Sequence, residues 1–185
     1  MNITEFALYL CEFNSTKQKR IISLFNKLLI NNDIKITIGT VRGDGKCFLY
    51  SIAEQIKNYN MDRLYDDFTT EQISAMFEPS IIKLCEKTIG LNPLEGIDGQ
   101  CPNLELLIYG YINTTFNNVV LININNNNNV NYDRFLCYPS SNNDINNDTY
   151  YIFSHNGHCY PVFIKSKFAR RQIFNILNTT RSLNI

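Results

Sequence analysis

Apolar residues recur at helical spacing in the first part of the chain. From residue 16 to 30 they return every three or four positions, as on one face of an amphipathic helix, and a shorter helix is expected over residues 4–12. Residues 34–41 alternate between apolar and polar side chains, which is typical of a short strand. A glycine-containing break at residues 42–46 follows, and helical spacing resumes from Cys47.

The rest of the chain combines further helices with apolar runs and polar loops. The pattern predicts helices over residues 69–90 and from Pro102, a buried strand over 119–124, and strands over 150–154 and 158–164. The dipeptide Asn156-Gly157 between the last two strands is a strong signal for a hairpin turn. The asparagine-rich stretches 125–131 and 140–148 are predicted to be low-complexity loops.

No internal repeat and no linker divides this pattern, so residues 1–185 are predicted to form a single domain. Its core is expected at about residues 35–165, and the N-terminal helices fall within residues 4–30. The tail carries several Lys and Arg residues and is expected to form a peripheral basic helix at about residues 166–181.

Composition argues against two classes of protein. Lys and Arg total 17, as do Asp and Glu, so the formal net charge is zero, whereas a nucleic-acid binder needs clustered basic residues. With 44% hydrophobic and 12% aromatic residues, the chain is too apolar for a disordered protein. Its start lacks a signal-peptide pattern, and no run approaches the roughly 18 apolar residues of a membrane span. We therefore expect a cytoplasmic monomer that binds neither nucleic acid nor membrane.

The six cysteines are spread singly through the chain. None forms a C-x-x-C pair, so neither a disulfide framework nor a structural zinc site is expected. The densest group of potential metal ligands is His155, His158 and Cys159, which matches a metal site poorly, and no metal is expected there. Most of the cysteines are expected to be small buried apolar residues.

One cysteine stands in a setting that suits chemistry. In Gly43-Asp44-Gly45-Lys46-Cys47, two glycines allow a sharp turn and the cysteine begins a predicted helix. The free N–H groups and partial positive charge of a helix N-terminus lower the pKa of a thiol and can hold an oxyanion. The alternative is a glycine turn followed by a core cysteine.

The chain contains two histidines, and they are near neighbours. A cysteine nucleophile needs an adjacent base, for which imidazole is the usual group. His158 enters the predicted strand 158–164 and can be held rigidly, whereas His155 lies beside the turn. The alternative is that both are exposed loop residues.

Taken together, these two segments resemble the ovarian-tumour-domain (OTU) family of cysteine proteases. GDGKCFLYSIAEQI resembles the family's nucleophile motif, and YYIFSHNGHCYPVFI resembles its C-terminal histidine strand. Residues 97–124 are similar to the intervening block, a helix that leads into a buried strand. The resemblance covers roughly residues 35–165. It implies an α+β, papain-like fold in which helices flank a small, mostly antiparallel central sheet.

The resemblance also implies a deubiquitinase, a thiol isopeptidase that removes ubiquitin or a ubiquitin-like modifier from lysine side chains without a cofactor. Carried over to this chain, Cys47 is the nucleophile and His158 the general base. Asp44 matches the motif's aspartate and shapes an oxyanion loop that presents the backbone N–H groups of Asp44, Gly45 and Cys47. A role in host ubiquitin signalling, in the host cytoplasm, is implied for a viral or parasitic source.

Two positions depart from the family pattern. Lys46 replaces the usual asparagine, and Tyr160 stands where many members carry the Asp or Asn that orients the histidine. The orienting residue is then expected elsewhere, with Asn156 and Asp33 as candidates, or the site is a Cys–His dyad. Two other functions are alternatives: a catalytically weak or inactive OTU-like ubiquitin-binding module, and another papain-like cysteine hydrolase.

Overall fold

A computed structural model describes seven stretches of the chain: residues 36–60, 62–95, 102–124, 135–142, 144, 146–155 and 157–182. The helices expected over residues 4–12 and 16–30 lie outside the described residues, as do Asp33 and Asn156. Within the described part, no helix is both long and apolar enough to cross a membrane.

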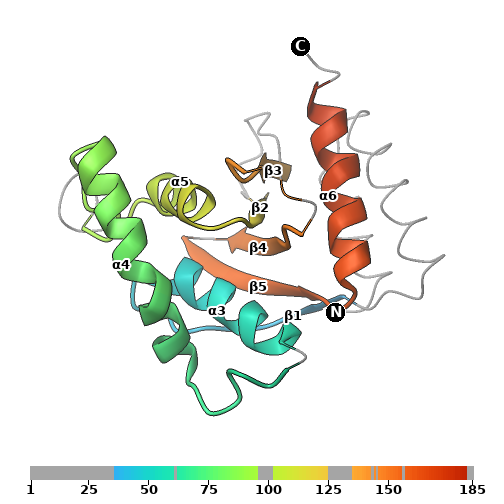
Figure 1. The fold of residues 1–185 in the computed structure, drawn as a ribbon, viewed down its shortest axis with the longest axis horizontal. Coiled ribbons are helices and arrows are strands. Elements are labelled where there is room, and N and C mark those ends of the chain that lie inside the picture. Colours follow the sequence, from blue (N-terminus) through green and yellow to red (C-terminus); the bar gives the residue numbers. More distant parts are fainter. Residues whose placement is uncertain are drawn as a thin grey trace.

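A five-stranded mixed sheet forms the centre of the described fold (Figure 1). Its strands are β1 (Ile36–Ile38), β2 (Asn118–Ile124), β3 (Phe135–Tyr138), β4 (Thr149–His155) and β5 (His158–Ile164). They lie in the order β1-β5-β4-β2-β3. The β2–β4 pair is parallel and the other three pairs are antiparallel. With its helices, the sheet gives the α+β class that the resemblance implies.

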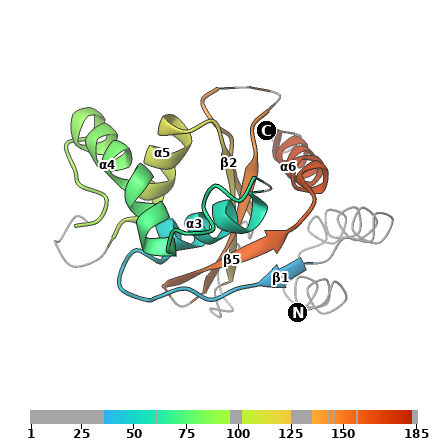
Figure 2. The same ribbon diagram turned by 60° about the horizontal axis from the view of Figure 1, so that its bottom comes forward.

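Helices cover both faces of this sheet, as Figure 2 shows. On one face lie α3 (Cys47–Tyr59), α4 (Thr70–Thr88) and α5 (Leu104–Thr114), and on the other lies α6 (Lys167–Ser182). The alternation of side chains along a strand explains the division, because Val119 and Leu121 of β2 join the α3–α5 cluster while Val120 and Ile122 join the α6 cluster. An apolar run without alternation, as in β2, is therefore what a strand buried on both faces requires.

The helices begin where local signals place them. Thr69 and Gln72 form a capping box at the start of α4, and the Asn103 side chain accepts a hydrogen bond from the Leu106 N–H at the start of α5. The helix predicted over residues 69–90 is thus confirmed as α4. Gly110 lets α5 approach α4 closely, since a Cβ there would lie only 2.5 Å from Ile81 Cγ2.

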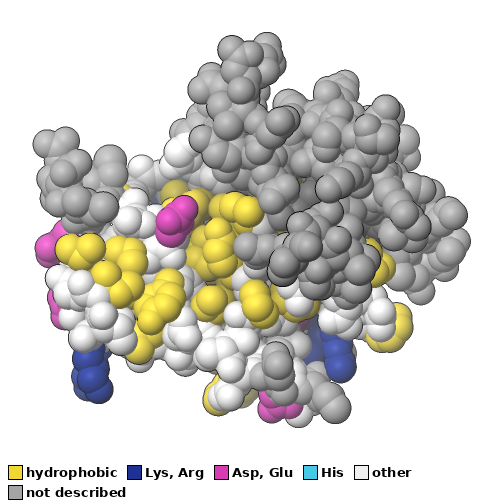
Figure 3. All heavy atoms as spheres, turned by 90° about the horizontal axis from the view of Figure 1, so that it is seen from above, with side chains coloured by type: hydrophobic (Ala, Val, Ile, Leu, Met, Phe, Trp, Pro, Cys, Tyr) yellow, Lys and Arg dark blue, Asp and Glu magenta, His cyan; other side chains and the backbone are white. Residues whose placement is uncertain are grey.

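Not all large apolar side chains are covered. Met76 on α4 and Tyr109 on α5 are 51% and 37% exposed, and Phe116 in the following turn is 59% exposed. Figure 3 shows apolar side chains gathered on the face seen from above, with few charged groups among them. This distribution agrees with the low charged fraction of 18%.

The C-terminal helix differs from the prediction, because α6 is not peripheral. Its residues Ala169, Ile173, Phe174 and Leu177 are buried in the core, and Arg170 is only 2% exposed. A basic residue can be buried only if its charge and its N–H donors find partners.

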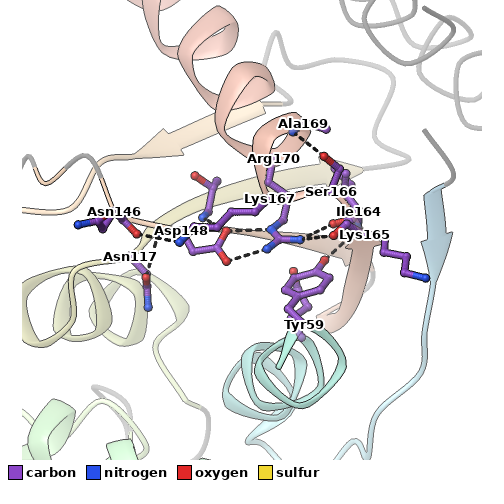
Figure 4. A network of polar contacts seen from close by, with 12 residues as sticks. Tyr59, Asn117, Asn146, Asp148, Ile164, Lys165, Ser166, Lys167, Ala169 and Arg170 are labelled. Carbon is purple, nitrogen blue, oxygen red and sulfur yellow. Dashed lines mark hydrogen bonds and ion pairs between the residues drawn. The ribbon is translucent and has the colours of Figure 1, made fainter. Parts of the chain in front are cut away.

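Arg170 finds those partners in three other elements (Figure 4). Its Nε and Nη2 donate to the two carboxylate oxygens of Asp148, both at 2.8 Å. Its Nη1 donates to the carbonyl oxygens of Ile164 and Lys165 at 2.6 and 3.0 Å. The guanidinium carbon lies 3.6 Å from the ring centroid of Tyr59 on α3. The Arg170 side chain thus joins α6, the end of β5, the segment before β4 and α3.

Replacing this arginine tests how much the fold depends on it. In Arg170→Met the partly buried Asp148 carboxylate loses its charge partner, and we expect the free energy of unfolding to fall by about 3–5 kcal/mol. Urea denaturation followed by circular dichroism measures the change. Arg171→Met removes an exposed charge from the same helix and should change stability by less than about 0.5 kcal/mol. Equal losses of unfolding free energy in the two variants would contradict the stabilising role of the Arg170 contacts.

Candidate active site at the start of α3

A cavity of about 640 Å³ opens at the N-terminal end of α3. The loop of residues 43–46 and Cys47 form one wall, and His158 and Cys159 at the start of β5 form another. Pro102, Leu104 and Leu107 contribute apolar surface. The fold therefore brings the two segments that the sequence singled out, the Cys47 loop and the His158 strand, to one cavity.

Cys47 is the first residue of α3 and is half-buried. The preceding residue, Lys46, makes no side-chain cap, and the first turn of the helix contains no acidic residue. The Cys47 sulfur accepts a hydrogen bond from the backbone N–H of Cys159, with an N–S distance of 3.4 Å. A sulfur that accepts a hydrogen bond beside an uncapped helix start is in a setting that stabilises the thiolate.

These contacts lower the pKa of the Cys47 thiol to about 6. The largest cause is a hydrogen bond from the Cys159 thiol; partial burial opposes it, and the Cys159 N–H, the charge of His158 and the Phe48 N–H then lower the pKa further. The hydrogen bond to the Cys47 side chain, burial and the Cys47 charge, in that order, raise the pKa of the Cys159 thiol, so Cys159 keeps its proton. Near neutral pH the site therefore holds a thiolate on Cys47 and a neutral thiol on Cys159.

Cys159 is the site residue that sequence reasoning missed. It was expected to be a buried apolar cysteine, and it is indeed only 4% exposed. Its position directly after His158 was the available signal, because its backbone N–H lies beside the nucleophile once His158 is brought to the same cavity.

His158 is half-buried, and its ring faces the 43–46 loop. A Cβ on Gly43 would lie 3.5 Å from His158 Nδ1, which is an ordinary van der Waals distance, so the imidazole lies directly beside this loop. The His158 ring also packs edge-to-face against Tyr160, with 4.6 Å between the ring centroids. Tyr160 thus contacts the histidine at the position where an Asp or Asn was expected from the resemblance. The proposed orienting residues Asn156 and Asp33 lie outside the described residues and stay predictions.

The side chain of Asp44 shapes the loop that precedes Cys47. Its Oδ1 accepts the Lys46 N–H at 3.2 Å, and its Oδ2 accepts the Tyr50 hydroxyl at 3.0 Å. Burial and the contact with Asp44 raise the pKa of Tyr50 to about 12, so the phenol remains a donor. Gly45, which lies between Asp44 and Lys46, has a φ of 89°, a backbone conformation that favours glycine.

A second contact holds this loop against α4. Lys46 Nζ lies 2.9 Å from Glu78 Oε1, and the Glu78 side chain is only 16% exposed. Lys46, which replaces the usual asparagine, therefore points to α4 and ties the loop to it. Asp44 accepts the Lys46 N–H, whereas the other backbone N–H groups of the described residues 44–47, those of Asp44, Gly45 and Cys47, have no acceptor.

The densest group of potential metal ligands in the sequence is His155, His158 and Cys159. Among the described side chains, no group of three or more His, Cys, Asp and Glu residues could hold a metal ion. The His155 side chain lies outside the described side chains.

The acidity of Cys47 can be measured directly by its rate of alkylation. With iodoacetamide we expect the rate to follow a single ionisation with a midpoint near pH 6. Cys159→Ala removes the largest cause of the low pKa, so the midpoint should move up towards the ordinary thiol value of about 8.5. Mass mapping of the Cys47 peptide assigns the reaction. An unchanged midpoint in Cys159→Ala would show that the second thiol does not stabilise the thiolate.

Two comparisons with known proteins gave no match. No model of a known protein family matches the chain, and a search of the curated proteins found no significant match.

Proposed function

We propose that the protein is an OTU-type cysteine protease that hydrolyses isopeptide bonds to ubiquitin or a ubiquitin-like modifier. The observation that carries the proposal is the low-pKa thiol of Cys47, at an uncapped helix start, in the same cavity as His158. The resemblance of both segments to the OTU motifs, in the family's order, supports the substrate class. An α+β fold with a mostly antiparallel sheet is compatible with an OTU fold.

In the proposed reaction, the Cys47 thiolate attacks the carbonyl carbon at the C-terminus of the modifier. The carbonyl oxygen becomes an oxyanion, and the free N–H groups of the 44–47 loop stabilise it. His158 donates a proton to the departing lysine amine, and a thioester remains on Cys47. His158 then takes a proton from water, the resulting hydroxide attacks the thioester, and the thiolate is released. No metal or organic cofactor takes part in these steps.

The walls of the cavity suit an extended peptide tail. Pro102, Leu104 and Leu107 line the cavity together with the loop and His158, and their apolar surface excludes water from a bound aliphatic chain. We propose that the modifier's C-terminal tail binds along this surface. We also propose that the protein acts as a monomer on conjugates in the cytoplasm, and that it binds neither nucleic acid nor membrane.

One observation favours a second function. Tyr160 contacts His158 where a polar orienting group was expected, and an aromatic ring cannot hold one imidazole tautomer as a carboxylate does. A protein that keeps the cleft but hydrolyses slowly would act as a ubiquitin-binding module.

A ubiquitin probe with a C-terminal electrophile separates these functions. We expect covalent labelling of the wild-type chain, no labelling of Cys47→Ala, and a loss of about 1,000-fold or more in chain cleavage by that variant. Parallel probes made from ubiquitin-like modifiers identify the preferred modifier. Binding of ubiquitin without labelling would favour the binding module. Labelling by simple thiol reagents but by none of the modifier probes would favour another cysteine hydrolase.

A single hydroxyl group tests the oxyanion loop. Tyr50→Phe keeps the buried ring but removes the hydrogen bond to Asp44, and we expect kcat to fall about tenfold with KM within about twofold. Steady-state hydrolysis of a fluorogenic ubiquitin substrate measures both constants.

Tyr151→Phe is the matched control for this change. Its buried hydroxyl also loses a hydrogen bond, to the Arg170 carbonyl at 2.6 Å, but on the opposite face of the sheet. That variant should lose stability and keep its kcat. Equal values of kcat in the two variants would contradict a role for Tyr50 in positioning the loop.

A further inference from the structure

The cleft contains a second thiol that the proposed reaction does not use as a nucleophile. Cys159 follows the base in sequence, faces α3 and packs in the same cluster as Cys47. Its backbone nitrogen is 3.4 Å from the Cys47 sulfur, and its side chain is the largest cause of the lowered pKa of the Cys47 thiol. Both sulfurs are reduced in this structure. Two thiols this close, one ionised and one neutral, are suited to a reaction with each other.

The two cysteines differ in exposure, and this difference determines which of them an oxidant reaches first. Cys47 is half-buried and lines the open cavity, whereas Cys159 is 4% exposed. A small oxidant therefore reaches Cys47 first. A thiolate with access to solvent is also the form that peroxide oxidises.

We propose that Cys47 and Cys159 form a reversible disulfide when the protein meets hydrogen peroxide. The Cys47 thiolate attacks one peroxide oxygen, the O–O bond breaks, and the other oxygen leaves as hydroxide, which takes from the solvent the proton that Cys47 had released on ionising and becomes water. Cys47 is then a sulfenic acid. The Cys159 sulfur attacks the Cys47 sulfur, the S–S bond forms, and the S–O bond breaks. The released hydroxide takes the Cys159 proton and leaves as a second water. In total, two thiols and one peroxide give one disulfide and two waters, and each sulfur loses one electron.

The local electrostatics favour the second step once the first has occurred. The charge on Cys47 and the hydrogen bond to it are causes that raise the pKa of the Cys159 thiol. The neutral sulfenic acid removes that charge, so the Cys159 sulfur gives up its proton more readily as it attacks. Burial of Cys159 still opposes ionisation.

The other described cysteines make different contacts. Cys137 belongs to the cluster on the α6 face of the sheet, whereas Cys159 packs on the α3 face. The Cys85 thiol lies between α4 and α5, where it donates to the Leu106 carbonyl oxygen at 3.4 Å. A disulfide needs about 2.05 Å between sulfurs and about 3.5–4.5 Å between Cβ atoms, and among the described cysteines only Cys159 contacts Cys47.

Such a disulfide would switch the site off without destroying it. Cys47 in a disulfide cannot attack a carbonyl group, and it is also protected from irreversible oxidation to sulfinic acid. A dithiol reductant restores both thiols by exchange. The inference goes beyond the proposed function, because it depends on the two sulfurs and not on the substrate.

The test exposes the reduced chain of residues 1–185 to hydrogen peroxide until iodoacetamide no longer labels Cys47. Peptide mapping by mass spectrometry under non-reducing conditions should find a Cys47–Cys159 linkage with the loss of two hydrogen atoms. Dithiothreitol should restore about 90% of the labelling in wild type but about 10% or less in Cys159→Ala, in which Cys47 proceeds to sulfinic acid. Both chains are compared at a pH above the Cys47 pKa of each, so that a different degree of ionisation does not explain the result.

Two further variants keep the test decisive. Cys137→Ala removes a thiol from the opposite face of the sheet and should recover as wild type does. Cys159→Ser keeps the size of the side chain in case Cys159→Ala fails to fold, and it should be as irreversibly oxidised. Sulfinic acid on Cys47 of wild type at the same dose, a linkage of Cys47 to another cysteine, or no oxidation of Cys47 would each overturn the proposal. Because the mapping needs no modifier, its failure is distinguishable from failure of the proposed function.

Discussion

The contact between the start of α3 and the start of β5 is the constraint on which the site depends. There the Cys159 N–H reaches the Cys47 sulfur at 3.4 Å, and His158 is held one residue away on the same strand. A thiolate at this point is stabilised by the Cys159 thiol, by backbone N–H groups and by the charge of His158. The low pKa is therefore a property of how a helix end meets a strand end, and no single side chain accounts for it.

The rest of the fold holds these two elements in register. Arg170 binds Asp148 and the carbonyl groups at the end of β5, and it stacks on Tyr59 at the far end of α3. The Tyr59 hydroxyl in turn accepts the Ile164 N–H at 2.8 Å. The helix α3 and the strand β5 are thus tied together at both ends, by Cys47 and Cys159 at the cavity and by Tyr59 and Ile164 at the Arg170 side chain.

The sequence predicts what depends on local signals and misses what depends on long-range contacts. It places α3 from Cys47, α4 near residues 69–90 and β2 near residues 119–124, because periodicity and capping are local. The strand expected over 34–41 is shorter, since β1 ends at Ile38 and the Gly39 N–H makes a last bond to Pro161. Strand β3 was missed between two asparagine-rich stretches. The burial of Arg170 depends on Asp148, within a stretch expected to be a loop, and the role of Cys159 depends on how β5 meets α3. Neither contact leaves a periodic pattern.

The ionisation of Cys47 is the central claim, and the ultraviolet absorbance of the thiolate measures it without any substrate. We expect the difference in absorbance between the wild-type chain and Cys47→Ala to rise with pH, with a midpoint near pH 6. A midpoint at the ordinary thiol value of about 8.5 would contradict a lowered pKa of Cys47, because the helix start and the Cys159 contacts would then not stabilise the thiolate.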